Sequence, residues 1–135
     1  MDATIKHIGK IKSVLKTIED CPLQGNENAP DAEVIIYPEF IEGIKDIKPG
    51  AEILLLTWLH AADRSVIKCY PRNNIDAPVV GVFSTRSPDR PNPLGLHRVT
   101  VLEIVGRRLK VGPLEAIDGT PVVDIKPVLS PSTDR

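Results

Sequence analysis

Short runs of apolar and β-branched residues, separated by turn-forming residues, recur along most of the chain. The predicted strands are Thr4–Val14, Ala32–Tyr37, Ala51–Ala62, Val66–Cys69, Val79–Ser84, a hairpin from Val99 to Gly112 that turns at Gly106-Arg107-Arg108, and the run VVDIKPV. Strands at roughly ten-residue spacing with little helix are typical of closed all-β folds. The pattern therefore predicts a single-domain antiparallel β-barrel of about seven strands, in which closure removes exposed edges.

Four segments depart from simple alternation. Gly9 interrupts Thr4–Val14, which favours a strand with a glycine bulge. Ala51–Ala62 is almost continuously apolar and indicates a strand buried on both faces. Pro38–Ile47 has apolar residues at helical spacing behind a proline, so it predicts the one short helix. The polar stretch Leu15–Ala29 is a long connection of the kind that often carries function.

Composition places the chain among ordinary globular proteins. Its 135 residues are most simply one domain, residues 1–135, with a frayed tail at 129–135. A net charge of −1 excludes a globally basic polyanion binder but allows a local basic patch. Aromatic residues make up 4% of the chain, so few side chains are available to stack on nucleic-acid bases.

The cysteine pattern and the N-terminal residues indicate the cellular compartment in which the protein is expected. Cys21 and Cys69 form no C-x-x-C pair, which fits a reducing environment. The N-terminal residues lack the apolar core of a signal peptide. The longest apolar run, AEILLLTWLHAA, is too short to span a bilayer and includes Glu52 and His60. We expect a cytoplasmic protein that contacts no membrane.

Common catalytic motifs are missing from the sequence. There is no G-x-G-x-x-G, no G-x-x-x-x-G-K-[ST], no H-E-x-x-H and no G-x-S-x-G. The three histidines are far apart in the sequence, so no metal site is predicted. Glu115, Asp118 and Asp124 could form paired carboxylates for acid–base chemistry, although an aspartate before glycine is more often part of a turn.

The segment Gly81–Val99 reads GVFSTRSPDRPNPLGLHRV and carries three prolines and several arginines. Prolines at 88, 91 and 93 lack an amide donor and restrict their neighbours, so the segment is predicted to be neither a helix nor a central strand. A stiff loop fixes guanidinium groups at low entropic cost, and such groups suit a carboxylate or phosphate. The alternative is a rigid surface connection with scattered arginines.

A second turn is predicted at Asp118-Gly119-Thr120-Pro121. In such a turn the aspartate accepts a hydrogen bond from its own downstream amide, glycine allows positive φ, and proline ends the ladder. Gly95 and Gly119 lack a Cβ, which lets a ligand approach the backbone closely.

Two long stretches resemble a known family. TRSPDRPNPLGL at 85–96 and DGTPVVDIKP at 118–127 are similar to the signature stretches of the TsaA/TrmO-like family, and CPLQG and WLHAA add weaker similarity. The resemblance extends from about residue 5 to about residue 129. It implies a β-barrel homodimer that binds S-adenosyl-L-methionine and methylates the exocyclic nitrogen of threonylcarbamoyl-adenosine in tRNA.

The resemblance also implies site residues. Arg90 and Asn92 would lie on the substrate side, although which of Arg86 and Arg90 meets the cofactor is left open. The proton-accepting group could be Asp118, His60 or Tyr70. The implied cofactor residues are Pro22, Leu23, Gln24, His60, Ala61, Arg86, Leu96, Asp118, Gly119, Thr120 and Pro121.

The sequence ends soon after the second stretch, whereas bacterial tRNA-modifying members continue into another domain, so we expect a short form. Docking of tRNA would then depend on the dimer and on the basic patch Arg98, Arg107, Arg108 and Lys110. The alternative function is a non-catalytic barrel that binds nucleotide-like ligands or RNA as a sensor or adaptor.

Overall fold

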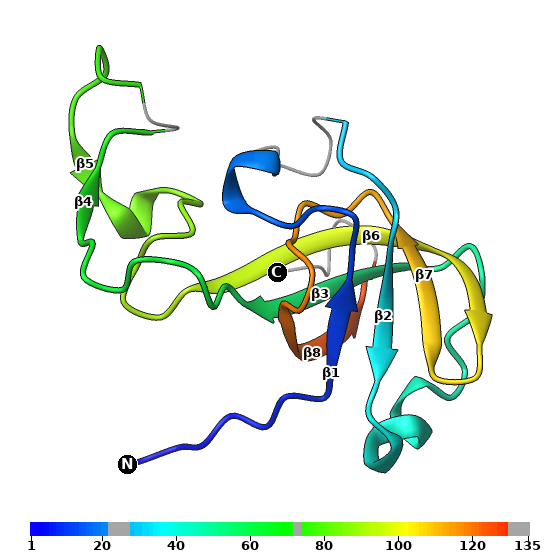
Figure 1. Cartoon of the computed structure of the whole chain (residues 1–135). Helices are drawn as coiled ribbons and strands as arrows, with labels where there is room; N and C mark the ends of the chain where they lie inside the picture. The colour runs from blue at the N-terminus through cyan, green and yellow to red at the C-terminus, as the bar shows by residue number, and fades with distance from the viewer. Residues whose placement is uncertain (22–27, 72–73, 130–135) are drawn as a thin grey trace.

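The structure is a computed structural model that describes residues 1–21, 28–71 and 74–129. Six antiparallel strands close into a barrel in the order β1-β2-β7-β6-β3-β8, and β4 pairs with β5 in a separate ribbon (Figure 1). In these residues the strands are β1 (Gly9–Lys12), β2 (Ala32–Ile36), β3 (Glu52–Trp58), β4 (Lys68–Cys69), β5 (Val80–Gly81), β6 (Leu94–Val105), β7 (Arg108–Gly112) and β8 (Pro121–Pro127). The predicted all-β barrel is confirmed.

The core lies inside the ring because alternate residues of each strand point inward. Leu55 of β3, Val101 of β6 and Val111 of β7 are completely buried there. Along β3, buried residues alternate with half-buried ones. The prediction that this strand is buried on both faces is therefore wrong for its outer face, since a single-layered barrel encloses only one face of each strand.

Gly9 begins β1 and sits where two strands come very close. It pairs in regular register with Ile36 of β2 and Val122 of β8, so the predicted strand is present but the predicted bulge is not. A Cβ on Gly9 would lie 2.3 Å from the carbonyl oxygen of Ile35. Glycine is needed at this position because the backbones of β1 and β2 lie too close together to accommodate a side chain.

The segment Gly81–Val99 divides at Pro93. Residues 85–93, which we call the proline loop, form no helix or strand. From Leu94 onward the chain is strand β6, which pairs with β3 on one side and β7 on the other. The prediction that the whole segment lies outside a central strand is wrong for residues 94–99, because all three prolines precede Leu94.

The turns and the one predicted helix lie close to their expected positions. The helix is η2 (Pro38–Ile44), a 3-10 helix. Strands β6 and β7 are joined by a two-residue turn in which Gly106 has φ +58°, so Arg108 already belongs to β7. Gly119 has φ +86° in the second predicted turn. Positive φ explains glycine at both positions.

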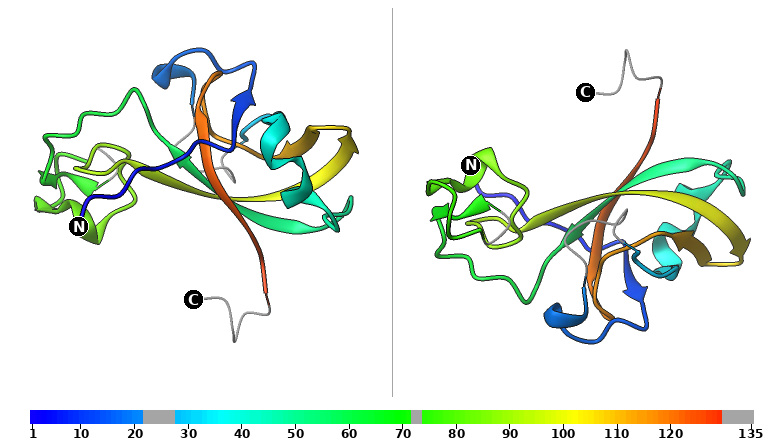
Figure 2. Two further views of the ribbon diagram at one scale, coloured as in Figure 1. Left: turned by 90° about the horizontal axis from the view of Figure 1, so that it is seen from below. Right: turned by 90° about the horizontal axis from the view of Figure 1, so that it is seen from above.

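A small lobe, built from β4, β5 and η4 (Val82–Ser84), lies beside the barrel (Figures 1 and 2). Only two residues of the predicted strand Val79–Ser84 pair with β4. The chain then turns into η4, where the amide and hydroxyl of Thr85 both donate to the carbonyl of Val82, at 3.0 and 2.8 Å.

The long connection predicted over Leu15–Ala29 contains η1 (Ile18–Asp20) where the structure describes it. Of the predicted frayed tail, only Leu129 lies within the described residues. No helix in the described residues is long and apolar enough to cross a membrane.

Candidate active site

A cavity of about 1080 Å³ opens beside the first half of β6. This volume is slightly above the usual range for small-ligand pockets, roughly 300–1,000 Å³. Its wall combines the loop that follows β3, the proline loop, β6, and the segment between β7 and β8. Of the residues predicted from sequence, it contains His60, Ala61, Arg86, Arg90, Leu96 and Thr120. The two signature stretches, separated in sequence, therefore meet at one cavity.

Other predicted residues lie elsewhere. Tyr70 follows β4 in the lobe and does not line the cavity. Asp118, Gly119 and Pro121 are next to cavity residues in the sequence, and Asn92 is two residues from Arg90 and from Leu94, but none of the four lines the cavity itself. The predicted residues Pro22, Leu23 and Gln24 lie outside the described residues.

Arg90 ties the proline loop together from within. Its Nε donates to the carbonyl of Ser87 at 2.8 Å, and its Nη2 donates to the carbonyls of Val82 at 3.1 Å and Thr85 at 2.5 Å. Hydrogen bonds from a charged donor are stronger than neutral ones. Arg90 thus holds the loop in shape while its side chain remains part of the cavity wall.

Arg64, which the sequence reasoning missed, holds the proline loop from outside. Its Nε donates to the carbonyl of Pro91 at 2.7 Å, and its Nη2 donates to Asn92 Oδ1 at 3.2 Å. The guanidinium carbon also lies 5.0 Å from the ring centroid of Trp58, within cation–π range. The Asn92 amide oxygen is therefore engaged with Arg64, a contact between segments far apart in the sequence that no local pattern could reveal.

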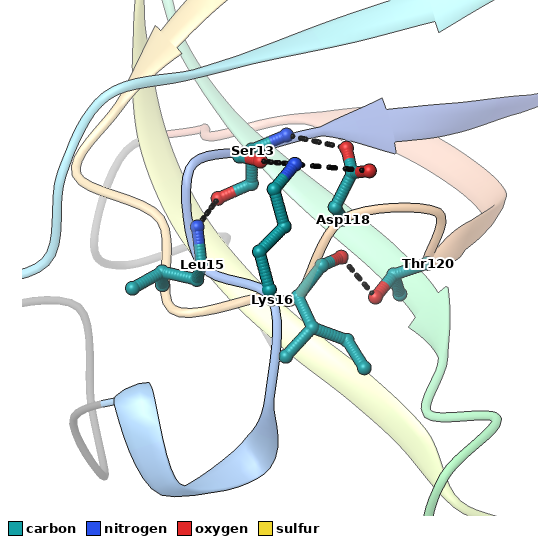
Figure 3. Close-up of polar contacts among 6 residues, drawn as sticks. Ser13, Leu15, Lys16, Asp118 and Thr120 are labelled. Carbon is teal, nitrogen blue, oxygen red and sulfur yellow. Dashed lines mark hydrogen bonds and ion pairs between the residues drawn. The ribbon is translucent and has the colours of Figure 1, made fainter.

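The Asp118-Gly119 turn is fastened to the end of β1 (Figure 3). Asp118 Oδ1 accepts from the amide of Ser13 at 2.9 Å, and Oδ2 lies 3.2 Å from Lys16 Nζ. The prediction that Asp118 accepts from its own downstream amide is wrong, because Ser13 supplies the donor. The Ser13 amide and the Lys16 ammonium hold the pKa of Asp118 below its ordinary value.

The backbone of this turn is also engaged. The amide of Asp118 donates to the carbonyl of Leu15 at 2.7 Å, and that of Gly119 donates to the carbonyl of Ile11 at 2.8 Å. The hydroxyl of Thr120 donates to the carbonyl of Ile117 at 2.7 Å. The turn is thereby fixed against β1 with Thr120 facing the cavity.

A buried polar chain forms part of the cavity floor. Thr57 Oγ1 lies 2.7 Å from His97 Nε2, and His97 Nδ1 lies 2.5 Å from Glu115 Oε1. From the sequence, Glu115 was predicted only as one of three carboxylates, with Asp118 and Asp124, that could pair for acid–base chemistry. Asp118 faces Ser13 instead. The contact that Glu115 makes is with a histidine on another strand.

Cys21 also lines the cavity. Burial raises the pKa of its thiol, and the nearby carboxylates of Asp20 and Glu115 add to the effect. The thiol is therefore neutral near pH 7 and is poorly suited to act as a nucleophile.

Curated relatives cover most of the chain. A "Probable S-adenosyl-L-methionine-binding protein" of Methanothermobacter thermautotrophicus is 42% identical over 127 residues, which is 94% of this chain and 90% of the relative. An "S-adenosyl-L-methionine-binding protein" of Archaeoglobus fulgidus is 42% identical over 90% of this chain and 86% of its own length. A second Archaeoglobus fulgidus relative is 44% identical, and the match covers 34% of that protein.

Solved structures agree with the fold. The crystal structure of TrmO from Pseudomonas aeruginosa superposes with a TM-score of 0.78 at 27% identity over all of this chain, which spans 60% of that protein. A further TrmO crystal structure gives a TM-score of 0.79 at 29% identity, and this chain again spans 60% of it. The family model described as the tRNA-methyltransferase O N-terminal domain matches residues 10–135. The resemblance noted in the sequence is thus confirmed, and the chain belongs to the tRNA-methyltransferase O N-terminal domain family.

Proposed function

We propose that this chain is an S-adenosyl-L-methionine-dependent methyltransferase whose cofactor binds in the cavity beside β6. The observation that carries the proposal is the meeting of Arg86 and Leu96 with Thr120 in one wall. The relatives named as S-adenosyl-L-methionine-binding proteins support the cofactor prediction.

The chemistry of the wall fits this cofactor. Arg86 is an exposed guanidinium suited to the amino-acid carboxylate, and Leu96, with 45% of its surface exposed, gives an apolar face for adenine. His60 and Ala61 also belong to the wall. Asp118 and Gly119 hold the turn next to Thr120 through their contacts with Ser13 and Ile11. The cofactor contacts predicted for Asp118, Gly119, Pro121, Pro22, Leu23 and Gln24 remain predictions.

When bound, the cofactor supplies a methyl group on a sulfonium that is already activated for transfer. The protein then has to align the acceptor with that methyl group and exclude water. A loop braced by Arg64 and Arg90 is suited to this task because its shape is set before any ligand binds.

We propose that the acceptor is the exocyclic nitrogen of threonylcarbamoyl-adenosine in tRNA. The structural likeness to TrmO supports this, and Arg90 and Asn92 remain the proposed substrate-side residues. Two arginines of the basic patch expected to hold tRNA form ion pairs, which reduces the positive charge of the patch. Arg98 Nε lies 2.6 Å from Glu52 Oε2, and Arg108 Nη1 lies 3.4 Å from Glu33 Oε2.

The patch is also divided between two sites. Arg98 lines the cavity beside β6, whereas Arg108 and Lys110 line a second hollow of about 760 Å³. Arg107 Nη1 donates to the carbonyl of Ile36 at 2.7 Å. The proposed tRNA contact would therefore have to extend across both hollows rather than use one basic surface.

We further propose that the protein is a homodimer and acts in the cytoplasm, where it would meet tRNA. The lobe presents Phe83, Ile75 and Ile67 with 80%, 76% and 63% of their surface exposed. Several large exposed apolar side chains in one small lobe are consistent with an interaction surface there. Light scattering should give twice the mass of one chain, and Phe83→Asp should shift the equilibrium toward monomer. A monomer at all concentrations would contradict the dimer.

The function is tested in two stages. Calorimetry with S-adenosyl-L-methionine should show binding, and no heat at millimolar ligand would contradict the proposal. Transfer of a tritiated methyl group to tRNA carrying threonylcarbamoyl-adenosine should follow, with tRNA lacking that modification as the control. Binding without transfer to any tRNA would favour the alternative, a sensor or adaptor barrel.

A further inference from the structure

We propose that Glu115 is the group that accepts the proton from the methyl acceptor, and that His97 and Thr57 are positioning residues that hold its carboxylate. This inference rests on the proposed methyltransferase function. The sequence offered Asp118, His60 and Tyr70 for the task. Asp118 is held by Ser13, and Tyr70 is in the lobe, outside the cavity wall.

Glu115 combines burial with access to the cavity. Its side chain is 15% exposed and lines the cavity wall, while His97 behind it is 4% exposed. A carboxylate has about four acceptor positions, so the contact with His97 through Oε1 leaves Oε2 for a proton donor in the cavity. His60 lines the same cavity but is exposed, so it lacks a comparable fixed orientation.

The histidine is oriented from its other side. The carboxylate of Glu115 can only accept a hydrogen bond, so His97 Nδ1 carries a proton and donates to it. In the neutral ring Nε2 is then an acceptor, and the Thr57 hydroxyl, 2.7 Å away, is placed to donate to it. Thr57 itself is completely buried in β3. The hydrogen-bonded series Thr57–His97–Glu115 thereby fixes the orientation of the Glu115 carboxylate in the cavity wall. A general base commonly needs such an orienting partner.

Gly95 makes room for this chain. A Cβ at Gly95 would lie 2.4 Å from Thr57 Oγ1 and 2.7 Å from His97 Nε2. Any larger residue would displace the Thr57–His97 contact. Gly95 also lines the cavity, so close approach of a ligand to its backbone stays a prediction, and its missing Cβ in addition makes room for two side chains of the same protein.

The proposed step balances in atoms and charge. As the acceptor nitrogen bonds to the methyl carbon, the carbon–sulfur bond breaks with its electron pair remaining on sulfur. The nitrogen's proton passes to Glu115 Oε2, which becomes a carboxylic acid and returns the proton to water after product leaves. A carbamoyl-substituted nitrogen is a weak nucleophile, so removal of its proton in the transition state has a direct benefit.

The test compares Glu115→Gln with wild type, Glu115→Asp and the exposed-surface control Glu42→Gln. Single-turnover transfer by Glu115→Gln should fall by about a hundredfold or more, as for loss of a general base, while cofactor affinity stays within about threefold. Glu115→Asp should recover part of the rate, and Glu42→Gln should match wild type. Circular dichroism of each variant checks folding.

A readout independent of activity tests the positioning. The ring nitrogens of His97, assigned by their loss in His97→Asn, should change their ¹⁵N chemical shifts in Glu115→Gln. Unchanged shifts, transfer within threefold of wild type, or a parallel loss of cofactor binding would each overturn the inference. A wild-type protein that binds cofactor but transfers no methyl group would instead refute the proposed function.

Discussion

Replacing Gly95 with alanine should destabilise the fold through a specific clash. The new Cβ would lie 2.4 Å from Thr57 Oγ1, 2.7 Å from His97 Nε2 and 3.1 Å from Leu59 Cδ2. Thr57 is completely buried and His97 is 4% exposed, so neither side chain can move into solvent. One of them has to change rotamer, and the hydrogen bond of 2.7 Å between them breaks.

The magnitude follows from two costs and one opposing gain in the free energy of unfolding. Overpacking a well-filled interior costs about 1–3 kcal/mol. Leaving a buried hydrogen-bonding group without its partner costs about 1–3 kcal/mol more. Against these, replacing glycine by alanine lowers the entropy of the unfolded chain by about 0.4–1 kcal/mol. Together these terms predict that Gly95→Ala lowers the free energy of unfolding by about 1–5 kcal/mol.

Urea unfolding measured by tryptophan fluorescence gives this difference, with an unchanged m value as a check on the two-state reading. Gly81→Ala is the matched control, because no heavy atom lies within 4 Å of the position of its Cβ. Thr57→Ala should cost less in the Gly95→Ala background than in wild type, since it removes the nearest clashing atom. If the free energy of unfolding of Gly95→Ala were within about 0.5 kcal/mol of wild type, Gly95 would not be tightly packed against Thr57 and His97.

Three further outcomes are expected. Asp118→Asn should reduce the loss of stability in acid. Because the pKa of Asp118 is lowered in the folded protein, its carboxylate stabilises the fold above the unfolded pKa, near 3.9, and this effect disappears as pH falls through the folded pKa. The urea midpoints at pH 7 and pH 3 should therefore lie closer together in the variant than in wild type. Arg64→Ala should speed amide hydrogen exchange over residues 85–93 while changing the global unfolding free energy by less than about 1 kcal/mol, and unchanged exchange would show that Arg64 does not hold the loop. Arg86→Ala should weaken cofactor binding by about 1–3 kcal/mol in calorimetry, and an unchanged affinity would remove Arg86 from the site.

The barrel could be predicted because its signals are local. Alternating apolar residues, glycine turns and proline breaks identified most strands, and the turns at Gly106 and Gly119 have the positive φ that glycine allows. The errors came from non-local effects. The glycine at position 9 predicts a bulge, because the sequence does not reveal that the Ile35 carbonyl oxygen of β2 would lie 2.3 Å from a Cβ there.

The candidate site was predicted only in part for the same reason. Arg86, Leu96 and Thr120 belong to long motifs that can be identified in the sequence, and the cavity brings them together. The contact between His97 and Glu115 depends on which residue of β6 faces inward and on the path from β7 to β8. Neither is encoded in a short pattern, so the buried polar chain became visible only in three dimensions.

The braces on the proline loop bear on which arginine meets the cofactor. Arg90 donates from two of its nitrogens to three backbone carbonyls, and removing it would change the shape of the loop as well as its charge. Arg86 lies on the same loop, is exposed and faces the cavity. Within the proline loop, Arg90 therefore maintains the shape of the backbone, whereas the guanidinium of Arg86 is available to bind a ligand. Carboxylate binding therefore belongs more naturally to Arg86, and a contact between Arg90 and substrate would have to coexist with its role in holding the loop.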